Sequence, residues 1–151
     1  MEKETKSKEE CERRLRWLGR YRAAADREQA LAEEIVWLRG QAEQIRTALT
    51  PGGAGQEPEE VRVPRAVQQL EAVCEELEIQ VENCLALRAQ IAHSIAALPD
   101  ARWRETLHRR FLLGQSQAEA AKAMHVSLRS LQRFQTEAVR ALELPQTEKS
   151  A

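Results

Sequence analysis

The sequence predicts an all-α protein with a long antiparallel helical hairpin of coiled-coil type in residues 1–98 and a three-helix domain of helix-turn-helix type in residues 99–144. The composition supports this class, because charged residues make up 31% and aromatic residues only 4% of the chain, which is typical of long amphipathic helices rather than of sheets. Apolar residues also recur at steps of three and four over two long segments, and prolines and glycines gather between those segments.

The first predicted helix covers about residues 9–49, where no proline occurs and only Gly19 and Gly40 interrupt a strongly helical composition. Its apolar side chains step by three and four residues, as a coiled-coil seam requires. The seam consists of Trp17, Tyr21, Ala24, Leu31, Ile35, Leu38, Ala42, Ile45 and Leu49.

A glycine- and proline-rich linker is expected at residues 50–64, because the run Thr50-Pro51-Gly52-Gly53-Ala54-Gly55 ends the helix and two more prolines follow. At about fifteen residues it is long for a helix connection. Glycine-rich loops can hold phosphate, but no strand precedes this one and no Lys-Ser/Thr pair follows it. We therefore interpret it as a turn.

A second seam follows Pro64 and is more regular than the first, with Arg88 as its one interruption. Its members are Val67, Leu70, Cys74, Leu77, Val81, Cys84, Arg88, Ile91, Ile95 and Leu98. This repeat can pair with the first helix as an antiparallel hairpin, with another chain, or with both. Cys74 and Cys84 occupy seam positions, where we expect them to pack as small apolar residues.

Three short helices are expected after Leu98-Pro99-Asp100, since Pro and Asp favour a helix start. The first covers residues 101–113 and ends at Gly114. We expect it to bury Trp103, Leu107 and Phe111 and to leave Arg102, Arg109 and Arg110 in solvent.

The next two helices have their own start signals. Ser116 and Glu119 form a capping box, His125 and Val126 interrupt the chain, and Ser127 caps the last helix. This last helix carries an inward stripe of Leu131, Phe134, Ala138 and Leu142. Two helices joined by so short a turn predict a helix-turn-helix.

The outer face of the last helix is the candidate DNA-binding surface, because Arg129, Arg133, Thr136 and Arg140 cluster opposite Leu131 at 100° per residue. Residues 99–144 contain about 8 basic against 5 acidic side chains, whereas residues 1–98 contain about 14 against 18. The candidate DNA-binding residues are Ser127, Leu128, Arg129, Ser130, Gln132, Arg133 and Thr136.

These residues have different expected roles. Arg129 and Arg133 are expected to contact the groove or the phosphates, with simple solvation of the helix as the alternative. Ser127 caps its helix while neighbouring backbone N–H groups meet a phosphate. Gln132 is the candidate base reader.

The run LPDARWRETLHRRFLLGQSQAEAAKAMHVSLRSLQRFQTEAVRAL, residues 98–142, resembles sigma-70 region 4. The whole chain resembles the phage and prophage family of sigma-like transcriptional regulators related to ArpU and RinA. Residues that match this pattern are Leu98 to Asp100, Arg109 to Phe111, Ser116, Ala121, Ser127 and Arg133. The chain departs from it at His125, where the family's turn carries a glycine that commonly has positive φ, and at Gln115 and Ala120, which replace larger apolar residues.

The resemblance implies a sequence-specific transcriptional regulator that binds double-stranded DNA and whose hairpin recruits RNA polymerase or dimerises the protein. A phage DNA-packaging protein, or an adaptor that docks RNA polymerase or another protein through a degenerate helix-turn-helix, remain alternatives. We expect no enzyme activity, cofactor or metal, because no catalytic set occurs and the three histidines are scattered.

The remaining features predict the compartment and the C-terminus. Three cysteines without a CxxC pair suit a reducing cytoplasm. No apolar run approaches the roughly 20 residues that span a bilayer, so we expect no membrane contact. Residues 145–151 are expected to form a flexible tail.

Overall fold

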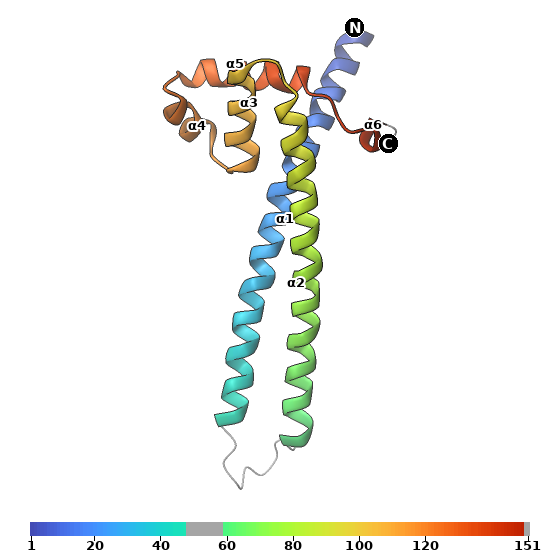
Figure 1. The fold of residues 1–151 in the computed structure, drawn as a ribbon, viewed down its shortest axis with the longest axis vertical. Coiled ribbons are helices and arrows are strands. Elements are labelled where there is room, and N and C mark those ends of the chain that lie inside the picture. The colour runs from blue at the N-terminus through green and yellow to red at the C-terminus, as the bar shows by residue number, and fades with distance from the viewer. Residues whose placement is uncertain (48–58, 150–151) are drawn as a thin grey trace. The chain divides into compact units, whose positions relative to one another are not determined.

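The computed structural model describes residues 1–47 and 59–149, and within these ranges all regular structure is helical (Figure 1). The predicted all-α class is confirmed. The helices are α1 (Glu2–Thr47), α2 (Glu59–Ala96), α3 (Ala101–Leu107), the π-helix η1 (His108–Leu112), α4 (Gln117–Met124), α5 (Leu128–Ala141) and α6 (Gln146–Lys149).

The expected linker at residues 50–64 falls mostly on residues 50–58 and, like the seam residue Leu49, these lie outside the described ranges. Residues 59–64 belong to α2, so the second helix begins earlier than the sequence suggested and contains Pro64. Pro64 is the sixth residue of α2, so it lies beyond the first turn and its missing N–H removes one backbone hydrogen bond of the helix.

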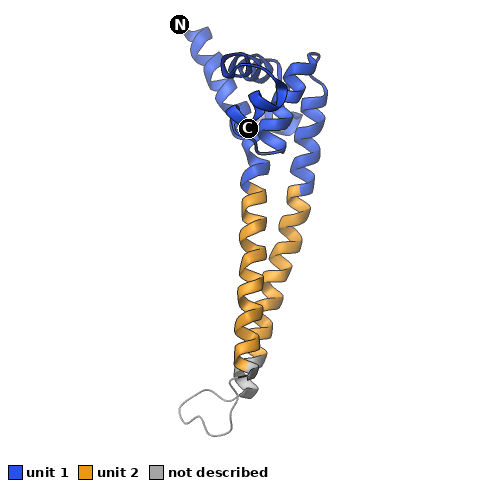
Figure 2. Cartoon of the chain, turned by 90° about the vertical axis from the view of Figure 1, so that its left-hand side faces the viewer, with its two compact units in different colours: residues 1–23, 85–151 blue, residues 24–84 orange. Residues whose placement is uncertain are grey.

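The chain divides into two compact units, which are coloured separately in Figure 2. Unit 1 consists of residues 1–23 and 85–151, and unit 2 consists of residues 24–84. This division differs from the expected boundary between residues 98 and 99. The reason is that both outer ends of the long helices share a core with the C-terminal helices.

In unit 2, α1 and α2 run side by side in opposite directions (Figures 1 and 2). The side-chain amide of Gln80 donates a hydrogen bond of 3.1 Å to the carbonyl of Ala24, and Arg27 lies 3.8 Å from Glu76.

Burial along the seam of unit 2 is uneven. Ala24, Leu31, Ile35 and Cys84 are buried, whereas Leu77 is half-buried and Val67 is 42% exposed. Two helices alone leave much of the predicted seam within reach of water.

In unit 1, one apolar core joins five helical segments. Its buried residues are Trp17, Leu18, Ile91, Ile95, Leu98, Leu107, Leu112, Ala138, Val139 and Leu142. Of the predicted seam residues in this unit, Trp17, Ile91, Ile95 and Leu98 are therefore buried and Tyr21 is partly buried, because α3, η1 and α5 cover sides that a two-helix pair leaves open.

The first C-terminal helix differs from its prediction, because α-helix ends at Leu107 and the π-helix η1 follows. The backbone N–H of Leu113 accordingly bonds the carbonyl of His108, five residues earlier. This wider turn changes which side chains point inward. Leu112 is buried, while Phe111 is only half-buried.

Arg110, expected in solvent, is instead half-buried in unit 1. Its guanidinium donates to the side-chain oxygen of Gln135 at 3.0 Å and to the carbonyl of Gln115 at 2.7 Å. The expectation for Arg110 was wrong, since these acceptors replace water around its charge.

The two ends of the segment α3–η1 agree with the sequence. The carboxylate of Asp100 accepts a hydrogen bond of 2.8 Å from the backbone N–H of Arg102 and so caps α3. Gly114 ends the segment with a φ of +71°, a conformation that favours glycine.

The C-terminal segment, expected to be a flexible tail, contains α6 within its described residues. Glu148 of this helix forms an ion pair of 2.6 Å with Arg20 of α1, inside unit 1. Within the described ranges, no helix combines the length and apolar character needed to cross a membrane.

Candidate nucleic-acid interface

Helices α4 and α5 are joined by a tight turn whose conformation follows from three side chains. The hydroxyl of Ser116 accepts a bond of 3.1 Å from the N–H of Glu119 and caps α4. His125 ends α4 in the left-handed conformation, with φ 57° and ψ 41°. Ser127 then caps α5 by accepting a bond of 3.1 Å from the N–H of Ser130. Both predicted serine caps and the positive φ at residue 125 are confirmed.

A small core holds these two helices together. Ala120 and Ala121 of α4 are buried against Leu131 of α5, with Met124 and Val126 partly buried around them. Alanine side chains allow two helix backbones to approach closely, but they bury little apolar area. The core between α4 and α5 is thus small, because Ala120 stands where the sigma-like family has a larger apolar residue.

Helix α5 separates an apolar face from a polar one. Leu131, Phe134, Ala138 and Val139 are buried. The opposite face exposes Leu128, Arg129, Gln132, Arg133, Thr136 and Arg140. The predicted orientation of α5 is confirmed, with its apolar stripe inward and its polar side chains outward.

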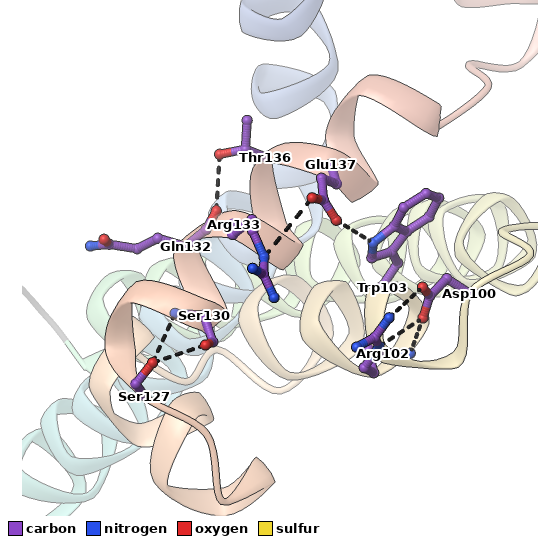
Figure 3. A network of polar contacts seen from close by, with 9 residues as sticks. All are labelled: Asp100, Arg102, Trp103, Ser127, Ser130, Gln132, Arg133, Thr136 and Glu137. Atoms are coloured by element: carbon purple, nitrogen blue, oxygen red, sulfur yellow. Dashed lines mark hydrogen bonds and ion pairs between the residues drawn. The ribbon is translucent and has the colours of Figure 1, made fainter.

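Several candidate residues are held by short polar contacts (Figure 3). The hydroxyls of Ser127 and Ser130 lie 2.9 Å apart, and Ser130 is half-buried. The hydroxyl of Thr136 donates to the carbonyl of Gln132 at 2.9 Å. The side-chain amide of Gln132 donates to Gln117 of α4 at 3.2 Å, so a base contact by Gln132 must compete with this bond.

Glu137 connects α5 to α3. One of its oxygens accepts a bond of 3.1 Å from the indole N–H of Trp103, and the other lies 4.0 Å from the guanidinium of Arg133 (Figure 3). Arg133 is thereby oriented without being neutralised by a close contact. Its side chain remains 63% exposed.

Arg102 of α3 lies beside the same part of the surface, a position that sequence analysis did not assign to the site. Its guanidinium carbon is 5.0 Å from the centre of the Phe134 ring, and that of Arg133 is 5.4 Å from it. Two arginines from different helices thus share one buried ring. The hydrogen bonds that Arg102 donates hold the pKa of the Asp100 carboxyl below its ordinary value.

Arg129 differs from these residues. It lies in the first turn of α5 and is exposed, and its guanidinium has no hydrogen bond or ion pair with any side chain or backbone group of residues 1–47 and 59–149. Its charge is therefore available to an anion without the loss of an existing contact.

Comparison of the chain with protein-family models, with curated proteins and with solved structures finds no match. In the part of the chain that the structure describes, no group of three or more His, Cys, Asp or Glu side chains is placed to hold a metal ion. The resemblance to sigma-like regulators thus rests on the residues of this chain alone.

Proposed function

We propose that the protein is a sequence-specific regulator of transcription that binds double-stranded DNA through α5, in the manner of sigma-70 region 4. We further propose that it is encoded by a phage or prophage and acts in the cytoplasm. The observation that carries the proposal is the outer face of α5, which presents three arginines and two neutral polar side chains on a helix capped by Ser127 and supported by α3 and α4.

Arginines and neutral side chains have separate roles in this proposal. Arg129 and Arg133 contact phosphate oxygens or the groove and hold the helix in register. Gln132 is the base reader, because an amide can bond adenine through a donor and an acceptor at once. Ser127 leaves neighbouring N–H groups at the start of α5 that suit a phosphate.

The test is a mobility-shift titration of the full-length protein on a duplex selected from a random-sequence pool, repeated over a range of salt concentrations. Combined Arg129→Ala and Arg133→Ala substitutions should weaken binding and reduce the slope of log K against log salt by about one unit per lost phosphate contact. Arg39→Ala and Arg88→Ala, which remove exposed arginines elsewhere, should leave the slope unchanged.

Gln132→Ala separates specificity from affinity. It should cost about 1 to 3 kcal/mol on the selected duplex and have little effect on random duplex DNA, because only a base contact discriminates between sequences. Equal losses on both duplexes would remove Gln132 from the base-reading role.

A second candidate function is a helical adaptor that docks a protein, such as RNA polymerase, through the same helices. It is favoured by two large apolar side chains in solvent, Leu113 at 49% and Leu128 at 47% exposure. If the wild-type protein binds no duplex at low salt yet captures RNA polymerase, the adaptor function replaces DNA binding. Response of a reporter promoter would separate transcriptional control from a role in DNA packaging.

A further inference from the structure

We propose that the first two turns of α1 form a second phosphate-binding surface, which extends the DNA-binding face of α5 onto the flanking backbone of the same duplex. This inference rests on the proposed function, because it assumes that α5 docks on DNA. It adds a segment at the opposite end of the chain, to which sequence analysis gave no binding role.

A surface groove brings the two segments together within unit 1. It is lined by Lys3, Glu4, Ser7, Lys8 and Cys11 of α1 and by Thr136 and Arg140 of α5. Thr136 and Arg140 belong to the outward face that also carries Arg129 and Arg133. The groove therefore continues the candidate interface.

Arg14 holds this part of α1 against α5. Its guanidinium donates hydrogen bonds to the carbonyls of Arg140 at 3.0 Å and Val139 at 3.4 Å. Cys11, Trp17 and Leu18 of the same helix pack into the core that contains Val139. Because these contacts lie within three turns of Lys8, they fix which face of α1 borders the groove.

The side chains around the groove suit a phosphate backbone. Lys3, Lys8 and Arg140 supply three positive charges against the one carboxylate of Glu4, and the hydroxyl of Ser7 can donate to phosphate oxygens. The hydroxyl of Thr136 already donates to the carbonyl of Gln132. Lysine is a flexible point charge, which fits contacts that need no particular sequence. Lys6, by contrast, does not line the groove and projects from the other side of α1.

The length of α5 places Lys3 and Lys8 at the edge of the DNA major groove that α5 enters. Arg129 and Arg140 are separated by about 16 Å along a helix that rises 1.5 Å per residue. The major groove is about 12 Å wide, so a helix that enters it from the Arg129 end meets the sugar-phosphate wall near Thr136 and Arg140. Lys3 and Lys8 lie at that wall.

The experiment compares the full-length Lys3→Ala/Lys8→Ala variant with Lys6→Ala, using the same selected duplex and a random-sequence duplex of equal length. The double variant should flatten the log K against log salt slope by about two units and weaken binding by tens of fold at 0.1 M salt, equally on both duplexes. Lys6→Ala should change neither quantity. Circular dichroism should show unchanged helicity, because all three lysines are exposed.

Three other results overturn the inference in distinguishable ways. If the double variant binds as the wild type does while Arg129→Ala/Arg133→Ala weakens binding, α1 has no part in the interface and the proposed function stands. If the double variant binds more tightly, this surface opposes docking. If the wild-type protein binds neither duplex, the inference and the proposed function both fail.

Discussion

The two compact units use the same apolar repeat with different results. Among the described residues of unit 2, α1 and α2 pack only against each other, and burial is confined to a few seam residues such as Leu31 and Ile35. In unit 1 the ends of the same helices meet α3, η1 and α5, and Leu18, Ile91 and Leu107 are fully buried. A heptad pattern therefore marks the side of a helix that can be buried. The number of helices that cover that side decides how much of each side chain is buried.

The largest expected effect of this difference is on the free energy of unfolding that is lost when a leucine is replaced by alanine. Leu107→Ala should lower the free energy of unfolding by about 2 to 5 kcal/mol, since its side chain is completely buried. Leu77→Ala in unit 2 removes the same atoms from a half-buried position and should lose less, about 1 kcal/mol. Urea denaturation followed by circular dichroism measures both, and equal losses would contradict the contrast between the units.

Replacement of a glycine by alanine should lower the stability of the protein in unit 1 and raise it in unit 2. Gly114→Ala in unit 1 should lower stability by about 1 to 2 kcal/mol, because a side chain at a φ of +71° is strained and its Cβ would lie 2.6 Å from Arg22. Gly40→Ala in unit 2 meets no atom within 4 Å. This helical position should gain about 0.5 to 1 kcal/mol. Thermal denaturation of both variants tests whether Gly114→Ala lowers the melting temperature and Gly40→Ala raises it.

His125→Gly is the reverse of the Gly114 substitution within unit 1, because it removes a Cβ from a residue with φ 57°. The change should be neutral or raise stability by up to about 1 kcal/mol. His125→Ala keeps the Cβ and should be less stable than the glycine variant. A loss of more than about 1 kcal/mol for His125→Gly would mean that the imidazole makes a stabilising contact.

The smallest expected effect is on pH dependence. The pKa of Asp100 is lowered in the folded protein by the hydrogen bonds from Arg102, so its stabilising contribution is complete above the ordinary value of 3.8 and is lost as the pH falls through the lower folded pKa. Asp100→Asn should remove this loss from acid denaturation curves. Glu76→Gln in unit 2 is the control, because its ion pair with Arg27 is long and exposed, and its curve should follow that of the wild type.

The parts of the structure that sequence analysis predicted correctly are governed by local chemistry. Asp100, Ser116 and Ser127 cap helices with their own side chains, and residue 125 has positive φ because the turn requires it. The outward face of α5 follows from helical periodicity alone. For these features the determining atoms lie within a few residues of each other in the chain.

The features that the sequence did not predict depend on distant partners. Arg110 is half-buried because Gln135, twenty-five residues away, accepts its hydrogen bond. The place of Lys3 and Lys8 beside Arg140 depends on the bonds of Arg14 to the end of α5. The π-helix η1 changes the order of inward side chains without a proline or glycine to mark it. Periodicity within one segment carries no information about such contacts.

A chain of contacts runs from Trp103 through Glu137 to Arg133 and links the polar face of α5 to one of the three tryptophans of the chain. A phosphate bound at Arg133 would draw the guanidinium away from Glu137, whose other oxygen accepts the indole N–H bond. The charge next to the indole would change, and indole fluorescence depends on the local field. If an anion occupies the outer face of α5, the emission of Trp103 on the neighbouring helix should therefore change.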